Sequence, residues 1–338
     1  MSTARSFIIA EAGVNHNGSL ETARQLVRAA HGAGADAVKF QTFRADAIVS
    51  RAAPKADYQR RTTAAEESQH AMLSRLELDL DAHQRLMALC DELGIVFLSS
   101  PFDQDSADLL ETLGITRYKL GSGEITNLPL LSHVAAKARP IILSTGMATL
   151  GEVEQAVHAI TAAGNTQLTL LHCVTEYPAP VSEVNLNAMI TLRHAFGFAV
   201  GYSDHTEGTE IAVAAAALGA SVIEKHLTLN RADSGPDHSA SLEPAEFAAM
   251  VAAVRNTEAA LGDGVKQPAP CEQKNIAAAR KSIVARVNIA TGEVLTAERL
   301  AVKRPGTGLP PALLDAVMGR SARRDITADE LITWDCLL

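Results

Sequence analysis

The chain has 338 residues, of which 47% are hydrophobic and 20% are charged. This apolar content excludes a disordered chain and is enough for one large core, or for one large and one small core. The 39 acidic residues outnumber the 30 basic ones and give a net charge of −9, which argues against a nucleic-acid-binding protein. A few Lys and Arg residues inside a cleft can nevertheless bind an anionic substrate.

The four cysteines are scattered and form no C-x-x-C pair, so neither a disulfide framework nor a zinc knuckle is predicted. The first residues lack the layout of a signal peptide. No run of about 18 apolar residues is available to span a membrane. We therefore expect a cytoplasmic protein that binds neither nucleic acid nor a membrane.

Short apolar runs alternate with helical patterns over most of the chain. The predicted strands are 7–13, 37–43, 95–102, 117–124, 140–147, 167–174, 198–205 and 221–228. Their near-continuous apolar character is typical of parallel strands that are covered on both faces. Eight βα units are the number that closes a (β/α)8 TIM barrel, so we predict an α/β protein with this fold. A doubly wound open sheet is the competing arrangement.

The character of the sequence changes after residue 261. Residues 262–282 resemble a linker, and residues 283–338 form a short module of strands and turns with a Gly/Pro-rich middle. We therefore predict a barrel domain over 1–261 and a small C-terminal domain over 283–338, which is too short to hold a large core.

Two histidines end neighbouring predicted strands at the rim where barrel enzymes hold their catalytic groups. They are His205 and His226, and Glu11 and Asp237 are available nearby. Two imidazoles with water or carboxylate oxygens suit Mn²⁺, Mg²⁺, Co²⁺ or Zn²⁺ at an open Lewis-acid site. The alternative is that each histidine is a hydrogen-bonded core residue.

Lysines from two strands are expected at the same rim. Lys39 and Lys119, together with several serines, suit a phosphate or a carboxylate; these serines are Ser100, Ser122, Ser144 and Ser203. The glycines beside Ser122 allow backbone N–H groups to approach an anion. The alternative is that each lysine pairs with a carboxylate such as Glu124.

Nine segments in order resemble the bacterial sialic acid synthase family, including its C-terminal antifreeze-like SAF domain. They are EAGVNHNGS (11–19), KFQTF (39–43), KLGSGEITNLPLL (119–131), ILSTGMATL (142–150), LLHCVTEYPAP (170–180), GYSDHTEG (201–208), IEKHLTL (223–229), SGPDHSASLEP (234–244) and VKRPGTG (302–308). The resemblance implies an enzyme that condenses phosphoenolpyruvate with an N-acetylated mannose-type sugar to give a nine-carbon 2-keto acid and phosphate.

The resemblance also implies roles for individual residues. His205 and His226 match ligands of a divalent metal, usually Mn²⁺, with Mg²⁺ or Co²⁺ as other possibilities. Phosphoenolpyruvate contacts are matched by Lys39, Ser100, Lys119, Ser122 and Ser203. Sugar or metal-water contacts are matched by Glu11, Gln41, Tyr177 and Asp237, and Glu124 matches a carboxylate near the reacting carbons. Arg304 matches an arginine that the C-terminal domain offers to the other subunit in a domain-swapped homodimer.

Departures from one branch of the family leave the sugar open. That branch has histidines where this chain has Phe40 and Phe43, and an asparagine where it has Thr175. Residues 58–78 resemble the branch that contains N,N'-diacetyllegionaminate synthases. N-acetylmannosamine, which would give N-acetylneuraminate, is kept as the default substrate of the family, and 2,4-diacetamido-2,4,6-trideoxymannose is the alternative. Two alternatives of another class are a Schiff-base aldolase that uses Lys39, Lys119 or Lys225, and a non-catalytic sugar-binding protein.

Overall fold

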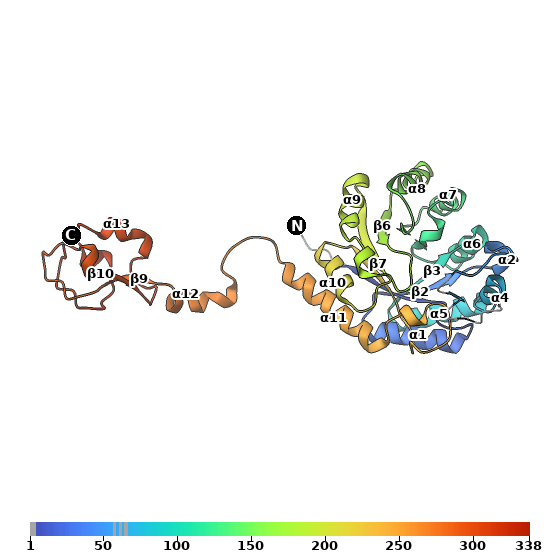
Figure 1. Ribbon diagram of the computed structural model, residues 1–338, viewed down its shortest axis with the longest axis horizontal. Coiled ribbons are helices and arrows are strands. Elements are labelled where there is room, and N and C mark those ends of the chain that lie inside the picture. Colours follow the sequence, from blue (N-terminus) through green and yellow to red (C-terminus); the bar gives the residue numbers. More distant parts are fainter. Residues whose placement is uncertain (1–4, 57–58, 61–62, 64–66) are drawn as a thin grey trace. The chain divides into compact units, whose positions relative to one another are not determined.

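The computed structural model describes residues 5–56, 59–60, 63 and 67–338, and the chain divides into two compact units, Met1–Gly264 and Val265–Leu338 (Figure 1). Part of the segment 58–78, which carries one resemblance noted above, therefore lies outside the described residues. Among the described residues, no helix combines the length and the apolar character that crossing a membrane requires.

The first unit is built around an eight-stranded parallel sheet. Its strands are β1 (Phe7–Gly13), β2 (Ala37–Thr42), β3 (Val96–Pro101), β4 (Tyr118–Leu120), β5 (Ile141–Ser144), β6 (Leu168–Cys173), β7 (Ala199–Asp204) and β8 (Val222–His226). The order is β3-β2-β1-β8-β7-β6-β5-β4, and the two end strands β3 and β4 also lie against each other. The sheet therefore curls into the predicted barrel, not into an open sheet.

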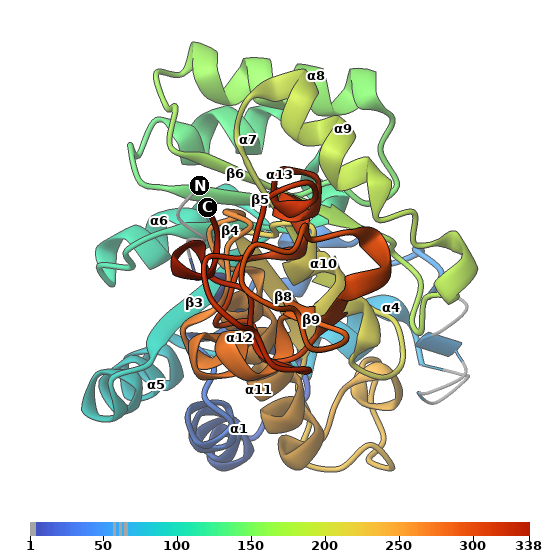
Figure 2. The same cartoon turned by 90° about the vertical axis from the view of Figure 1, so that its left-hand side faces the viewer.

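Helices cover the outside of the barrel. They are α1 (Leu20–Gly32), α5 (Leu80–Leu93), α6 (Gln104–Thr112), α7 (Leu128–Ala135), α8 (Leu150–Ala162), α9 (Asn187–Phe196), α10 (Glu210–Ala217) and α11 (Pro244–Leu261). Figure 2 shows α7, α8 and α9 on one side of the strands and α1, α5 and α11 on the opposite side. In α1, the Ser19 side chain accepts the Thr22 N–H at the N-terminus, and Leu26 and Val27 are buried against the strands.

The inside of the barrel is apolar toward one end only. Six buried side chains from alternate strand positions fill it there: Ile9, Ala37, Leu98, Ile142, Leu171 and Val222. Inward-facing side chains repeat every second residue, and two residues further along these strands they are polar except for Cys173: Glu11, Lys39, Ser100, Ser144, Cys173 and Glu224. The parallel register then places Glu11 beside Lys39 on one neighbouring strand and beside His226 on the other.

The sequence did not predict every helix. Two short helices, α2 (Ala45–Ile48) and α4 (Gln69–Ser74), lie in the long connection after β2, and α11 closes the barrel. Strand β4 is shorter than the predicted 117–124, because the chain turns into a 3-10 helix at Ser122–Glu124.

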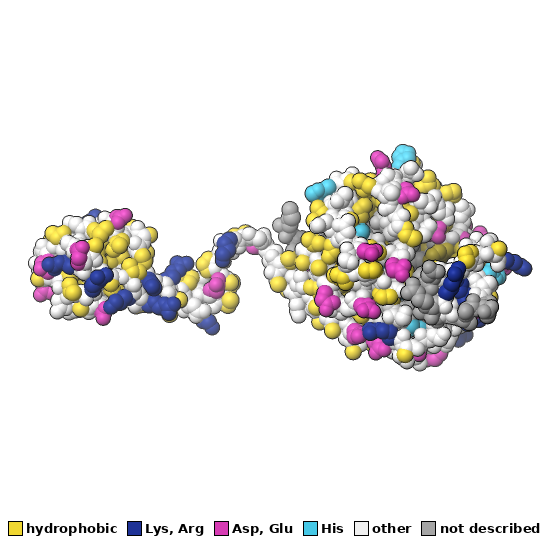
Figure 3. Space-filling model, in the orientation of Figure 1, with side chains coloured by type: hydrophobic (Ala, Val, Ile, Leu, Met, Phe, Trp, Pro, Cys, Tyr) yellow, Lys and Arg dark blue, Asp and Glu magenta, His cyan; other side chains and the backbone are white. Residues whose placement is uncertain are grey.

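The second unit has its own small core. It contains α12 (Gln273–Ala279), the antiparallel pair β9 (Ser282–Ala285) and β10 (Leu300–Lys303), and α13 (Leu314–Val317). Helix α12 lies in the segment that the sequence suggested was a linker. The core of the second unit contains Ile283, Leu295, Ile326 and Ile332, among others. Residues 265–338 hold 11 Lys and Arg against 8 Asp and Glu, and basic side chains gather along the segment of α12 (Figure 3).

Candidate active site

One cavity of about 340 Å³ opens where the carboxyl ends of the barrel strands meet. Thirteen of the fourteen predicted site residues line it: Glu11, Lys39, Gln41, Ser100, Lys119, Ser122, Glu124, Thr175, Tyr177, Ser203, His205, His226 and Asp237. The remaining one, Arg304, follows β10 in the second unit, where its Nε donates to the Ala279 carbonyl oxygen. With Ser144 of β5, which also lines the cavity, side chains from all eight strands or the segments that directly follow them meet at this rim.

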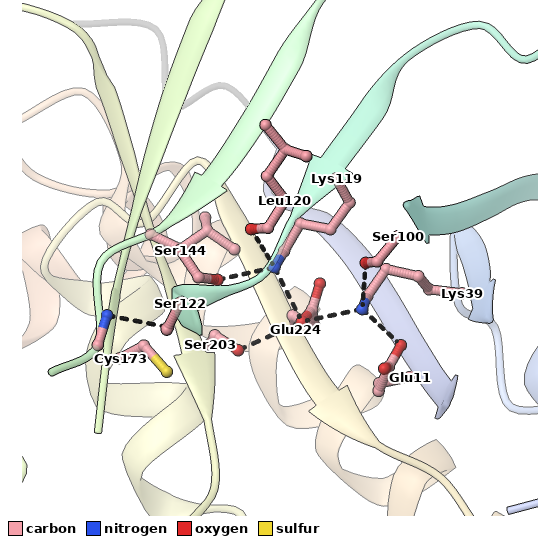
Figure 4. Close-up of polar contacts among 12 residues, drawn as sticks. Glu11, Lys39, Ser100, Lys119, Leu120, Ser122, Ser144, Cys173, Ser203 and Glu224 are labelled. Carbon is pink, nitrogen blue, oxygen red and sulfur yellow. Dashed lines mark hydrogen bonds and ion pairs between the residues drawn. The ribbon is translucent and has the colours of Figure 1, made fainter. Parts of the chain in front are cut away.

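A buried cluster of two lysines and two glutamates occupies the floor of the cavity (Figure 4). Lys39 Nζ lies 2.8 Å from Glu11 Oε2 and 3.6 Å from Glu224 Oε1, and Lys119 Nζ lies 3.5 Å from the same Glu224 oxygen. All four side chains are at most 5% exposed. The lysines therefore pair with Glu11 and Glu224, and not with Glu124 as the alternative reading of the sequence suggested.

Serine hydroxyls complete the environment of the lysines. Lys39 Nζ donates to Ser100 Oγ at 3.2 Å, and Lys119 Nζ donates to Ser144 Oγ at 2.7 Å. Ser203 donates to Glu224 Oε1 at 3.3 Å. Each lysine thus has a carboxylate and a hydroxyl as partners, which offsets the cost of burying its charge, while Glu224 Oε2 is buried without a hydrogen-bond partner.

Burial and charge pairing shift the pKa values of this cluster in different directions. Burial, partly opposed by Lys39, raises the pKa of Glu11 to about 7. Burial, together with the charge of Lys39 and against the attraction of Glu224, lowers the pKa of Lys119. The Glu11 and Glu224 carboxylates, in contrast, outweigh burial and raise the pKa of Lys39. Although burial opposes its charge, Lys119 and Lys39 lower the pKa of Glu224. Lys39 is therefore protonated and Glu224 is ionised at neutral pH.

Glu224 was not among the predicted site residues, although it is central to the cluster. A signal was present, because a glutamate inside the apolar run 221–228 requires a charged partner. What the sequence did not reveal is that this partner is a pair of lysines on β2 and β4, neither of which is a neighbour of β8 in the sheet.

The two predicted histidines lie side by side in the same cavity. Their ring centroids are 5.4 Å apart, and the Tyr177 ring centroid lies 4.2 Å from that of His205. His205 Nδ1 donates to the Val174 carbonyl oxygen at 2.7 Å, which leaves the lone pair on Nε2. His226 Nδ1 is buried without a hydrogen-bond partner, and Asp237 Oδ2 lies 3.8 Å from it.

This arrangement suits a divalent ion that takes only part of its ligands from the protein. Burial holds the pKa of His226 well below its usual range, and neutral imidazole is the form that binds metals. Within the described residues, no group of three or more His, Cys, Asp or Glu side chains is arranged to hold a metal ion. A metal at His205 and His226 would therefore complete its coordination with water or substrate oxygens.

Three polar groups converge on Gly13, at the end of β1. A Cβ atom built on this glycine would lie 3.2 Å from Glu11 Oε1, 3.4 Å from Asp237 Oδ2 and 3.4 Å from Gln41 Nε2. The absence of a side chain at Gly13 therefore leaves room for these groups to face one space.

Glu124 lies at the side of the cavity, where it accepts a hydrogen bond from Asn127 and where burial raises its pKa.

Ser122 and Thr175 meet at Gly146, which follows β5. The Gly146 N–H donates to Ser122 Oγ at 2.9 Å, and a Cβ atom at Gly146 would lie 2.2 Å from Thr175 Oγ1. The close approach of backbone to both hydroxyls requires glycine at this position.

Lys225 is not part of the cavity. Its Nζ donates to Asp204 Oδ2 and to the Thr206 carbonyl oxygen, both at 2.7 Å, and the side chain is fully buried. A lysine committed in this way cannot serve as the nucleophile of a Schiff-base aldolase at this site.

An apolar wall, defined here as Val14, Phe43, Ile48, Met72, Leu73, Leu76 and Phe102, lines the side of the cavity toward α2 and α4. Phe43 and Phe102 pack edge to face. Two polar residues, Gln59 and Gln69, also line the cavity. The cavity is thus charged at its floor and apolar on one side.

Comparisons with known proteins agree with this geometry. The NeuB family matches residues 26–266 and the SAF domain matches residues 280–338. The chain belongs to the NeuB family, as predicted. An N,N'-diacetyllegionaminic acid synthase of Campylobacter jejuni is 50% identical over 97% of this chain and 99% of the relative, and one of Legionella pneumophila is 44% identical over 99% and 95%. The crystal structure of the N-acetylneuraminic acid (sialic acid) synthetase of Leptospira borgpetersenii is 33% identical, with a TM-score of 0.71 over 81% of this chain and 91% of that chain.

Proposed function

We propose that this NeuB-family enzyme joins phosphoenolpyruvate to the open-chain aldehyde of an N-acetylated mannose-type sugar, with water as the third reactant. The observation that carries the proposal is the buried cluster of Lys39, Lys119, Glu11 and Glu224 beside the His205–His226 pair. A cationic, hydroxyl-rich floor next to the imidazoles of His205 and His226 suits an anionic enol ester and an aldehyde oxygen at adjacent positions.

The reaction forms one carbon–carbon bond and releases phosphate. C3 of phosphoenolpyruvate attacks the aldehyde carbon, a hydroxyl from water adds to C2, and the bond between C2 and the phosphate oxygen breaks. Lys39, Lys119 and the hydroxyls of Ser100, Ser122 and Ser203 bind the carboxylate and phosphate. Gln41, Thr175 and Tyr177 orient the sugar. Glu11, Glu124 and Asp237 accept or hold the protons that water and the sugar exchange.

We propose a divalent cofactor, Mn²⁺ first and Mg²⁺ or Co²⁺ as substitutes, held by His205 and His226. When bound, such an ion polarises the aldehyde oxygen. The unpartnered Nδ1 of His226 and the fixed tautomer of His205 support this assignment.

Between the two candidate sugars, we propose 2,4-diacetamido-2,4,6-trideoxymannose. The two relatives with 50% and 44% identity carry the name of N,N'-diacetyllegionaminic acid synthase. The apolar wall supports the same choice, because the C6 methyl group and the methyl group of the second acetamido substituent bury there without loss of hydrogen bonds. A C6 hydroxyl of N-acetylmannosamine would need a polar partner on that side.

We further propose a domain-swapped homodimer in which Arg304 reaches the cavity of the partner subunit. The net positive charge of residues 265–338 supports contact with an otherwise acidic chain. All four cysteines, each among the described residues, are free thiols, which supports a cytoplasmic location.

The test is an assay of the purified protein with phosphoenolpyruvate, Mn²⁺ and each of the two sugars. We expect phosphate release that requires the sugar, is faster with the diacetamido sugar, disappears with EDTA and returns with Mn²⁺.

The variant His226→Ala is expected to be inactive and to lose Mn²⁺ binding. Activity that is indifferent to EDTA, together with borohydride trapping of pyruvate, would instead establish the aldolase. Sugar retention without turnover would establish a binding protein.

A further inference from the structure

The segment Asn15-His16-Asn17, directly after β1, has no part in the proposed chemistry, although its residues are polar and lie at the catalytic rim. Its side chains contact the connection between β8 and α11, which carries Asp237. Asn15 Nδ2 donates to the Leu227 carbonyl oxygen and to Ser241 Oγ, both at 2.9 Å. Ser241 Oγ in turn donates to the carbonyl oxygen of Asp237 at 2.6 Å.

A second set of bonds involves Asn17 and His238. Asn17 Nδ2 donates to the Ser234 carbonyl oxygen at 3.0 Å and lies 3.1 Å from His238 Nε2. Because an amide nitrogen is a donor, His238 Nε2 accepts this bond. His238 Nδ1 therefore carries the proton and donates to Thr228 Oγ1 at 2.7 Å, whose hydroxyl donates onward to the Asn230 carbonyl oxygen at 3.2 Å.

The backbone fits around these contacts with little freedom. Asn17 has a φ of +51°, a left-handed conformation that asparagine tolerates. Gly235 has a φ of +157°, and a Cβ atom there would lie 2.6 Å from His238 Cδ2 and 2.9 Å from Asn17 Oδ1. The chain passes from exposed residues at 230–234 to the buried residues 235–238, so these bonds lie where the connection turns inward to bring Asp237 into the cavity.

We propose that Asn17 and His238 form a clamp that positions the Asp237 carboxylate for sugar turnover. This inference rests on the proposed function for the role of Asp237. The clamp acts through Asp237 and touches neither Lys39 nor Lys119, so it affects the sugar and leaves phosphoenolpyruvate binding unchanged. A displacement of about 1 Å at a reacting group can lower turnover by up to 100-fold.

The main variant is Asn17→Gly, because glycine accepts the left-handed φ without strain and only the side chain is lost. Asn185→Gly is the matched control, since Asn185 is exposed and has the same φ of +51° but lies outside the clamp. We expect Asn17→Gly to lower kcat/KM for the sugar at least tenfold with an unchanged KM for phosphoenolpyruvate. His238→Gln, which keeps an acceptor for Asn17, is expected to retain more activity than His238→Leu. Asn185→Gly is expected to behave as the parent enzyme.

Two further measurements separate the clamp from the proposed function. In an Asp237→Asn background, Asn17→Gly should add little to the loss, because both changes disable the same carboxylate; additive losses would overturn the clamp. Hydrogen exchange of the amides at 240–242 should accelerate in Asn17→Gly but not in Asn185→Gly, whether or not the enzyme accepts the sugars tested. Unchanged exchange would refute the clamp, whereas an inactive parent enzyme, or an Asp237→Asn variant of full activity, would refute the proposed role of Asp237.

Discussion

Glu224 is the residue on which the buried cluster depends, because its carboxylate lies within 3.6 Å of both lysine ammonium groups. The variant Glu224→Gln preserves the shape but leaves two lysines with one carboxylate. We expect the free energy of unfolding to fall by about 3 kcal/mol, as is typical when one partner of a buried ion pair is removed. Urea unfolding measures this loss. Glu154→Gln, at an exposed position of α8, is the control and should leave the unfolding midpoint unchanged.

His16 makes stability depend on pH. Burial, reinforced by His83 and His238, lowers its pKa from 6.5 to about 4 in the folded chain, and its Nδ1 accepts the Gly18 N–H at 3.0 Å. As the pH falls below 6.5, the unfolded chain gains a proton that folded His16 does not take up until about pH 4. The stability contributed by neutral His16 is therefore lost over that window, with about 2 kcal/mol gone between pH 7 and pH 5.

The variant His16→Asn keeps an acceptor for Gly18 but does not titrate. Between pH 7 and pH 5, the unfolding free energy of the parent should fall by about 2 kcal/mol more than that of this variant. A difference that stays constant with pH would show that His16 does not hold its depressed pKa.

At the scale of the strands, a buried ion pair joins β7 to β8 and lies next to both histidines in sequence. Lys225 Nζ contacts Asp204 Oδ2 at 2.7 Å, and Thr206 N–H and hydroxyl donate to Asp204 Oδ1. We expect Lys225→Met to cost about 3–5 kcal/mol, because it leaves a buried carboxylate unpaired. Asp204→Asn combined with Lys225→Met should cost less than Lys225→Met alone. A double variant that is as unstable as the sum of the single variants would mean that the two residues are not coupled.

The strands were predictable because each is a continuous apolar run, and polar residues mark its carboxyl end. Strand β4 is the exception, since the polar segment after Leu120 turns into a 3-10 helix. Helix α11 was missed because alanines separate Phe247, Met250 and Val254 and weaken the helical period. The side chains that gather in the cavity were predictable from the rule that barrel strands end at one rim. The pairing of these side chains was not predictable. Glu224 contacts Lys39 and Lys119 across the barrel interior, and the sequences of strands that are not neighbours in the sheet do not show which of their side chains meet.

For the whole molecule, the contribution of Arg304 is the part of the proposal that needs two chains. Co-expression of Arg304→Ala and Lys119→Met chains under separate tags yields mixed dimers. If Arg304 serves the partner's cavity, a mixed dimer has one cavity with both intact groups and one with neither. Random pairing then restores about a quarter of the parent activity, although each variant alone is inactive.

The purified mixed dimer gives the decisive measurement, because it should have about half the activity of the parent dimer. A matched pair provides the control: Lys119→Met combined with Ser100→Ala places both changes in the barrel. Under the swapped arrangement every cavity of that mixed dimer carries one of the two defects, so pairing should restore nothing. If the Arg304→Ala and Lys119→Met mixture also restores nothing while the mixed dimer forms, Arg304 acts within its own chain or not at all, and the charge of residues 265–338 must serve another contact.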